Sequence, residues 1–351
     1  MRNKFIFRST FILFCLFLTG CSEQAGREGP ALLEELKYSL GLADRKQEGM
    51  VAVLKGHGMN VWSVQYSPDG KILASASMDD TIILWDTSRN GIIRILKSHT
   101  DPVISIDFHP AGSMLASGSK DHSIILWDVR SGRPLSIMKG HASSIWSVAF
   151  HPSGTSLGSA DNDGQIIIWD VANENRIISF PAHTGSVNVI RFSPQGKILA
   201  SGGDDGNVNL WDPATGKSLK TLKGHGSWVK SLAFSPDGKV LASGGMDQLI
   251  ILWDVKTGEK LRVLSGHRSG VFSVAFRPDG KSIFSGGPDQ AVIEWDVRTG
   301  QKTREWYNPY GYILGIDISP DGAVVAAASE DKVVVLFGNK ASPDGTGKSE
   351  K

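Results

Sequence analysis

Two residue types return through most of the chain at one fixed interval. Six His and six Trp each recur every 42 residues: His57, His99, His141, His183, His225 and His267, and Trp85, Trp127, Trp169, Trp211, Trp253 and Trp295. An interval of this length is typical of repeat proteins, in which each copy buries its apolar surface only against its neighbours. The sequence therefore predicts one array of similar units over most of its 351 residues.

Each unit divides into four short apolar segments separated by turn signals. In the first unit these segments are VWSVQYS, ILASAS, TIILWDT and IIRILK, and the turns between them are PDGK, MDD and RNG. This pattern predicts four antiparallel strands in each unit. The third segments are almost continuously apolar, as expected for sheets that neighbouring sheets cover on both faces.

The repeated signature GH…SPDG…S…D…WD resembles that of the WD-repeat β-propeller family, across residues 51–338. The resemblance implies a hydrogen-bonded tetrad in each blade, which runs from the third-strand Trp to a second-strand Ser, then to the His and to an Asp in the following turn. These positions are Trp85, Ser75, His57 and Asp79 in the first blade, and Trp253, Ser243, His225 and Asp247 in the fifth.

The seventh unit is degenerate. Ala327, Pro309 and Phe337 stand at its Ser, His and Trp positions, and only Asp331 remains. Losing three partners together is tolerable, because removing a single member of a buried network leaves the others unsatisfied.

The fourth strand of the seventh unit is missing from its expected place, since only the polar tail 339–351 follows Phe337. The segment MVAVLK at 50–55 precedes the first Gly-His pair as a fourth strand would, but has no first three strands of its own. Pairing it with VVVLF closes the ring and removes an open edge. The sequence thus predicts an all-β, seven-bladed β-propeller of four-stranded antiparallel blades, closed by an N-terminal strand and monomeric.

The N-terminus has the pattern of an export signal. Arg2, Lys4 and Arg8 precede the apolar run FILFCLFL, which has the length of a signal-peptide core and is too short to span a bilayer. Leu18-Thr19-Gly20-Cys21 resembles the lipobox of bacterial lipoproteins. That resemblance implies cleavage after Gly20, lipidation of Cys21, and anchoring outside the cytoplasmic membrane, on an outer membrane where one exists.

Residues 1–20 are thus expected to be a signal peptide and residues 21–50 a lipidated tether. Within the tether, the pattern of residues 30–41 predicts a short amphipathic helix. This helix either docks on the propeller or a partner, or it is a solvated spacer. Three of the 37 Lys and Arg leave with the signal, so 34 remain against 36 Asp and Glu. This near balance gives no indication of nucleic acid or of an anionic membrane surface as a partner. Removal of Cys15 leaves one thiol and therefore no disulfide; no cofactor or metal motif stands out.

Propellers resembling this one bind ligands at one mouth of the central channel. The resemblance places the contacts at the third and fifth residues after each repeat His and at the residue before each tetrad Asp. The candidate partner-binding residues at these positions are Trp62, Met78, Trp146, Trp228, Lys230, Met246, Phe272 and Tyr312. Aromatic and Met side chains with few charges are typical of an interface core. The alternative is that the rings only plug the narrow end of the channel.

The sequence indicates a non-enzymatic, lipid-anchored scaffold that binds a protein or an extended peptide at this mouth. One alternative is a glycan-binding propeller, in which the aromatic rings stack on cell-wall sugars. A second is an enzyme with a site at the channel mouth. That reading is disfavoured because the His, Asp and Ser residues recur in every blade as a packing motif.

Overall fold

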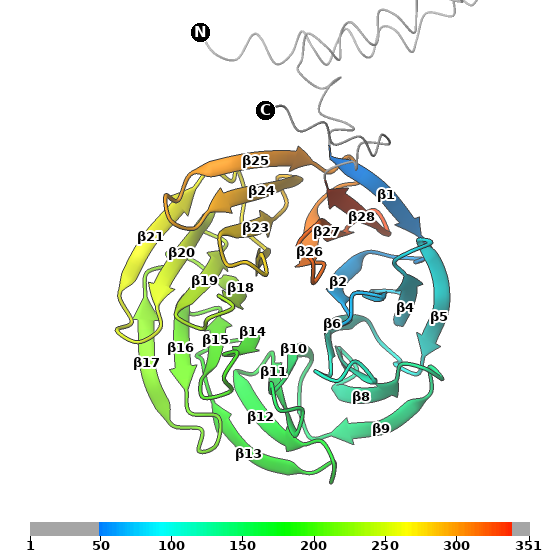
Figure 1. Ribbon diagram of the computed structural model, residues 1–351. Helices are drawn as coiled ribbons and strands as arrows, with labels where there is room; N and C mark the ends of the chain where they lie inside the picture. The colour runs from blue at the N-terminus through cyan, green and yellow to red at the C-terminus, as the bar shows by residue number, and fades with distance from the viewer. Residues whose placement is uncertain (1–48, 339–351) are drawn as a thin grey trace, which may run out of the picture. The chain divides into compact units, whose positions relative to one another are not determined.

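The computed structural model describes residues 49–338, and every strand in this range belongs to one of seven four-stranded antiparallel sheets arranged as a ring (Figure 1). We number the blades 1 to 7 and give the strands of each from the inner to the outer strand. Blade 1 has β2 (Val61–Tyr66), β3 (Ile72–Ser77), β4 (Thr81–Asp86) and β5 (Gly91–Lys97); blade 2 has β6 (Val103–Phe108), β7 (Met114–Ser119), β8 (Ser123–Asp128) and β9 (Pro134–Lys139); blade 3 has β10 (Ile145–Phe150), β11 (Ser156–Asp161), β12 (Gln165–Asp170) and β13 (Arg176–Pro181); blade 4 has β14 (Val187–Phe192), β15 (Leu199–Gly203), β16 (Asn207–Trp211) and β17 (Ser218–Lys223). Blade 5 has β18 (Val229–Phe234), β19 (Val240–Gly245), β20 (Leu249–Asp254) and β21 (Lys260–Ser265); blade 6 has β22 (Ser273–Phe276), β23 (Ser282–Gly286), β24 (Ala291–Asp296) and β25 (Lys302–Tyr307); and blade 7 has β26 (Ile313–Ile318), β27 (Val324–Ser329), β28 (Val333–Gly338) and β1 (Met50–Lys55). The fold expected from the repeat is confirmed.

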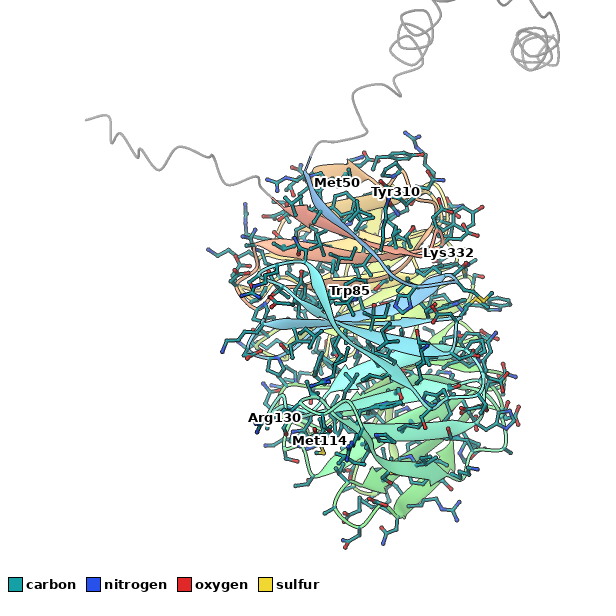
Figure 2. The ribbon with its side chains drawn as sticks, turned by 90° about the vertical axis from the view of Figure 1, so that its right-hand side faces the viewer. Met50, Trp85, Met114, Arg130, Tyr310 and Lys332 are labelled. Atoms are coloured by element: carbon teal, nitrogen blue, oxygen red, sulfur yellow. The ribbon has the colours of Figure 1, made fainter. Side chains whose placement is uncertain are left out.

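Two faces of the ring differ in their loops. One face carries the loops that hold the repeat His residues and the turns between second and third strands, and we call it the tetrad face. The other carries the turns between first and second strands and between third and fourth strands, and we call it the hairpin face. Figure 2 shows the ring edge-on, with Lys332 of the tetrad face and Arg130 of the hairpin face on opposite sides.

The turns between first and second strands follow the SPDG signature. In the first blade, the Gly70 amide donates to the Ser67 carbonyl at 2.8 Å, and Gly70 has φ of 71°, a value that glycine adopts without strain. The Ser67 hydroxyl donates to Asp69 and accepts the Ile72 amide, so the turn satisfies its own polar groups.

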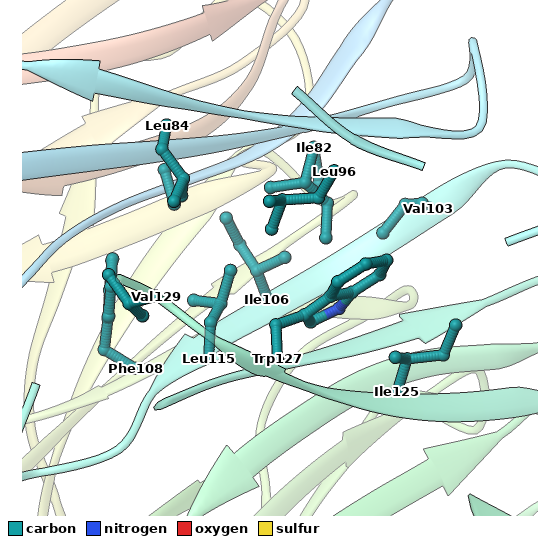
Figure 3. Packing of buried hydrophobic residues seen from close by; sticks show 12 residues of the cluster. Ile82, Leu84, Leu96, Val103, Ile106, Phe108, Leu115, Ile125, Trp127 and Val129 are labelled. Atoms are coloured by element: carbon teal, nitrogen blue, oxygen red, sulfur yellow. The ribbon is translucent and has the colours of Figure 1, made fainter. Parts of the chain in front are cut away.

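The core lies between neighbouring blades. Ile82, Leu84 and Leu96 of blade 1 pack in one cluster with Ile106 and Leu115 of blade 2 (Figure 3). The third strands β4, β8 and β12 are buried nearly throughout, because a sheet covers each of their faces. Seven such clusters repeat around the ring, so each blade depends on both of its neighbours for burial.

The tetrads form with the expected residues in five of the six blades that carry the signature. In blade 1, Trp85 Nε1 donates to Ser75 Oγ at 2.8 Å, His57 Nε2 lies 2.8 Å from the same oxygen, and His57 Nδ1 lies 3.1 Å from Asp79 Oδ2. Burial opposes ionisation of Asp79, yet hydrogen bonds from His57, Thr81 and the Gly58 amide hold the pKa of this carboxyl well below its usual range. The tetrad therefore ties the loop before the first strand to the second and third strands.

The third blade departs from the repeat. The 42-residue period points to Asp163 as its tetrad carboxylate, but His141 Nδ1 instead lies 2.7 Å from Asp161 Oδ2, at the end of β11. The second oxygen of Asp161 accepts the amides of Asp163 and Gln165. Asp161 is buried at the end of β11 and reaches the His141 ring directly, whereas Asp163 is exposed, so the period gave the wrong carboxylate in this blade.

The ring closes as the sequence predicts. β1 pairs antiparallel with β28 in a register that joins Val53 to Val335 and Leu54 to Val334, so the N-terminal strand is the outer strand of blade 7. Phe337, in place of the tetrad Trp, stacks on Trp306 with ring centroids 5.5 Å apart. Trp306 in turn stacks on Phe284 and is only 5% exposed, so it is part of the packed interior. A stack of aromatic rings thus replaces the missing hydrogen-bond network.

Serines on the inner strands also tie neighbouring blades together. The hydroxyls of Ser105, Ser147, Ser231 and Ser273 each accept the amide of a residue 43 positions later, in the next blade. Blade 7 has Gly315 at this position, where a Cβ would lie 2.7 Å from the Trp62 carbonyl oxygen of blade 1. Only glycine allows this close approach at the joint.

No helix within residues 49–338 is long and apolar enough to cross a membrane. The expected signal peptide, the amphipathic segment 30–41 and the tail 339–351 lie outside the described residues, and so does Cys21. Of the expected tether 21–50 only Gly49 and Met50 are described, and Met50 is the first residue of β1.

Candidate functional site

The candidate site is the channel mouth on the tetrad face. The first strands of all seven blades line a central cavity of about 110 Å3. Four of the eight sequence-predicted residues border this cavity, namely Trp62, Trp146, Lys230 and Phe272. The remaining four, Met78, Trp228, Met246 and Tyr312, are not among its lining residues.

Two of the channel indoles contact each other. Trp62 and Trp146 meet edge to face, with ring centroids 6.1 Å apart, although they come from blades 1 and 3. Trp146 Nε1 donates to Asn162 Oδ1 at 3.2 Å. Trp62 Nε1 is buried and has no hydrogen-bond partner among the described residues. This pair narrows the channel from one side and leaves an unpaired N–H donor there.

Lys230 joins this aromatic pair to Trp228. Its Nζ donates to Asn188 Oδ1 at 2.9 Å and lies 5.6 Å from the ring centroid of Trp146 and 5.4 Å from that of Trp228. Asn188 Nδ2 donates to Asp204 at 2.8 Å. Burial lowers the pKa of Lys230, and the Asp204 charge opposes that shift. The result is a fixed cation between two indole rings, a geometry that stabilises both rings and charge.

The exposed part of the site is centred on Trp228. Its side chain is 48% exposed, although it contacts Lys230, and it borders a polar recess of about 260 Å3 with Asp204, Gly226 and Ser227. Tyr312 of blade 7 is also exposed, at 44%. An exposed aromatic ring beside a polar recess is typical of an interface hot spot with a polar rim.

The two predicted Met residues are half-buried in the turns of the tetrad face. The Met78 amide donates to the Asn60 carbonyl at 2.9 Å, and the Met246 amide donates to the Trp228 carbonyl at 2.8 Å. A Cβ added at Gly270 would lie 2.7 Å from Met246 Sδ, so this thioether packs against the next blade. Met246 is thus linked through its backbone to the loop that presents Trp228.

A half-buried polar tier on the inner strands β2, β6 and β26 was missed by the sequence reasoning. Asp317 accepts the Tyr66 amide at 2.7 Å, Gln65 accepts the Phe108 amide at 2.6 Å, and Asp107 accepts the Phe150 amide at 2.5 Å. Each bond crosses to the next blade. The only sequence signal was a polar residue eight positions after the expected His, where other blades carry Ala149, Ala233 and Ala275.

Burial perturbs both carboxyls of this tier. It raises the pKa of Asp317 to about 6 and raises that of Asp107. The Tyr66 amide and the Arg191 charge oppose the shift at Asp317, whereas Asp107 adds to it. Arg191 borders the channel cavity and donates to its neighbour's carbonyl at 2.8 Å.

The repeated His, Asp and Ser residues are not placed for catalysis. Ser75 is fully buried, and its Oγ already contacts both Trp85 and His57. A nucleophile must reach substrate, and this hydroxyl faces the blade interior. Among the described residues, no group of three or more His, Cys, Asp or Glu is arranged to hold a metal ion.

A separate groove lies between blades 3 and 4. It has a volume of about 610 Å3 and is lined by Ile168, Ile177, Leu219 and Pro213, with His151 at one side. None of the sequence-predicted site residues lies in it.

Comparison with protein families assigns the repeat. The family model described as "WD domain, G-beta repeat" matches seven segments, at residues 49–86, 90–128, 132–170, 174–212, 216–254, 258–296 and 300–337. The first segment contains β1 of blade 7 together with the first three strands of blade 1, so the sequence repeat is offset from the structural blade and links neighbouring blades. No curated protein matches the chain. With more than half of its length covered by these seven matches, the chain belongs to the WD-repeat family of β-propellers.

Proposed function

We propose that this protein is a lipid-anchored interaction scaffold that acts outside the cytoplasmic membrane of a bacterium. WD-repeat propellers are typically non-enzymatic binding platforms, which supports the scaffold role. The lipobox-like sequence ending at Cys21 supports the anchor. The partner is a protein or an extended peptide segment, and the propeller itself is a monomer.

The observation that carries this proposal is the position of Trp228. Its indole is half-exposed on the tetrad face, yet Lys230 fixes one side of it, and Lys230 is itself held by Asn188. A large side chain that is rigid before binding loses little conformational entropy on contact with a partner. The adjoining polar recess offers hydrogen-bonding groups next to the ring. This combination is typical of a binding hot spot with a polar rim.

The binding site is tested by photo-crosslinking in intact cells, with a photoreactive amino acid replacing Tyr312. We expect one stoichiometric protein to be captured, and Trp228→Ala to reduce its capture by about thirtyfold, the effect of losing roughly 2 kcal/mol at a hot spot. Leu219→Ala is the matched control, because Leu219 is an equally exposed apolar side chain on the outer strand β17. Unchanged capture by Trp228→Ala would refute a partner site at the mouth.

The glycan-binding alternative has a distinct readout in the same variants. Stacking of Trp228 on sugar rings would shift tryptophan emission when soluble cell-wall fragments are added to the purified protein. Such a shift, lost in Trp228→Ala and present in Leu219→Ala, would replace the protein-partner assignment with a glycan-binding one.

The anchor is tested separately. In cells grown with a labelled fatty acid, the wild-type chain should carry the label and be found in the membrane fraction. The Cys21→Ser variant should remain unlabelled. Equal labelling of both proteins would exclude acylation at Cys21.

A further inference from the structure

The rim of the propeller carries most of the exposed apolar side chains. Ten of the 13 large exposed hydrophobic residues in the described range lie on outermost strands: Val51, Ile92, Ile93, Ile95, Leu135, Ile137, Ile177, Leu219, Leu261 and Val263. Six of these ten, from Val51 to Ile137, belong to the consecutive outer strands β1, β5 and β9. We call the surface of these three strands the apolar rim sector, and Figure 2 views the ring from its side.

The same sector is rich in unpaired cations. The segments 87–97 and 129–139, which contain β5 and β9, hold six Arg and Lys and no Asp or Glu. These six residues are exposed and form no ion pair within residues 49–338: Arg89, Arg94, Lys97, Arg130, Arg133 and Lys139. Arg94 Nε donates to the Arg130 carbonyl at 2.9 Å. Asp86 and Asp128 lie one residue before these segments and accept hydrogen bonds from the amides of their own turns, so among the described residues the six cations face only these two carboxylates.

Other parts of the rim lack this combination. The equivalent segments of blades 3, 5 and 6 each contain a carboxylate, at Glu174, Glu259 and Glu305. Blade 4 has three Lys but only one large exposed hydrophobic residue, Leu219. At the position of Ile93, blade 6 carries Thr303. The joint apolar and basic character is therefore a property of one sector and not of the repeat.

Aliphatic side chains interspersed with unpaired cations are suited to an anionic lipid surface. Such a surface accepts the aliphatic groups at the depth of the headgroups and neutralises the cations. The chain enters the propeller at Gly49, immediately before β1, and Cys21 lies 28 residues upstream. Covalent connection therefore attaches the proposed anchor to this sector of the rim, whatever the conformation of the tether.

We infer that the apolar rim sector rests on the anionic lipid surface to which the chain is anchored, an inference that relies on the proposed lipid anchor. Contact along β1, β5 and β9 orients the disc with its rim toward the lipid. The tetrad face is then perpendicular to the membrane plane, and the channel mouth stays open to a partner that approaches along the membrane surface.

The test uses the acylated chain on vesicles of phosphatidylcholine alone or mixed with phosphatidylglycerol, with a lipid-borne quencher in the bilayer. Ile93→Cys and Thr303→Cys place one fluorophore at the same position of blades 1 and 6, five periods apart. We expect quenching at position 93 to be at least about twofold greater than at position 303 on the mixed vesicles, because headgroup-depth contact brings only the first probe near the quencher. The double variant Lys97→Glu/Arg133→Glu should remove this difference.

Equal quenching at positions 93 and 303 on the mixed vesicles overturns the rim contact, while flotation with phosphatidylcholine vesicles still reports the anchor. Failure to float with phosphatidylcholine vesicles refutes the anchor instead. If the chain does not float, quenching at position 93 on the mixed vesicles supports the rim contact by itself. Absence of that quenching then overturns both the anchor and the rim contact.

Discussion

Replacing Asp317 by Asn should stabilise the propeller at neutral pH. Asp317 lies on the inner strand β26, and its carboxylate accepts the Tyr66 amide across the joint between blades 7 and 1. Burial raises its pKa from an ordinary 3.8 to about 6. Because each unit of pKa corresponds to about 1.4 kcal/mol, ionising this group in the folded state costs up to about 3 kcal/mol at pH 7. Asn removes the charge and keeps an oxygen that accepts the Tyr66 amide.

The sign of the pH dependence follows from the raised pKa. Between about pH 4 and pH 6 the folded chain binds a proton at Asp317 that the unfolded chain has released, so this contribution to the free energy of unfolding falls as the pH rises. The tetrad carboxyl Asp79 has a lowered pKa, so its contribution is present above its ordinary pKa and is lost as the solution becomes more acidic. We therefore expect the wild-type protein to be most stable near pH 5.

The assay is urea unfolding followed by tryptophan fluorescence at a series of pH values. The wild-type midpoint should decrease from pH 5 to pH 7, and Asp317→Asn should flatten this decrease. Asp101→Asn, which removes a charge from an exposed loop on the tetrad face, should leave the pH dependence unchanged. The reasoning is refuted if Asp317→Asn and the wild type show the same slope, or if wild-type stability rises from pH 5 to pH 7.

Three further predictions concern the blades and their closure. Ser75→Ala leaves the indole N–H of Trp85 and His57 Nε2 without their shared partner. It should lower the free energy of unfolding, measured by urea titration, by about 1 to 3 kcal/mol. An unchanged free energy of unfolding would mean that the tetrad does not contribute to stability. Leu115→Ala, at a fully buried position between blades 1 and 2, should lower the free energy of unfolding by about 2 to 5 kcal/mol. Ile95→Ala on the exposed rim should lower it by less than about 0.5 kcal/mol. Equal effects of the two substitutions would contradict the assigned core. The double variant Val53→Pro/Leu54→Pro, in the closing strand β1, should lower the thermal midpoint and increase proteolysis near blade 7. Successive N–H groups of an edge strand alternate in direction, so one of the two prolines removes a hydrogen bond to β28. An unchanged midpoint would show that the ring does not depend on β1.

The repeat allowed the architecture to be predicted in detail because each blade is built from contacts that lie within one period. The strand order and the closure by MVAVLK follow from local pattern and from the need to pair an open edge. The tetrads were expected from the resemblance to WD-repeat propellers, and five of the six use the expected carboxylate. The third-blade carboxylate did not follow, because Asp161 and Asp163 are equally good acceptors in sequence and only the turn geometry selects Asp161.

Contacts across the ring could not be predicted from the period. Trp62 meets Trp146 two blades away, and Lys230 lies between the rings of Trp146 and Trp228, because the curvature of the ring brings these first strands together. The serines that tie blades together and the polar tier of Asp317, Gln65 and Asp107 were missed for the same reason. Each depends on a spacing between inner strands that only the closed ring sets.

The affinity of the purified scaffold for the protein captured through position 312 tests the interaction role most directly. Titration calorimetry should show binding by the wild type and by Leu219→Ala with the same Kd, and about thirtyfold weaker binding by Trp228→Ala. The same Kd for all three proteins, with the propeller folded in each, would show that the partner binds elsewhere and that the exposed aromatic mouth is not the recognition surface.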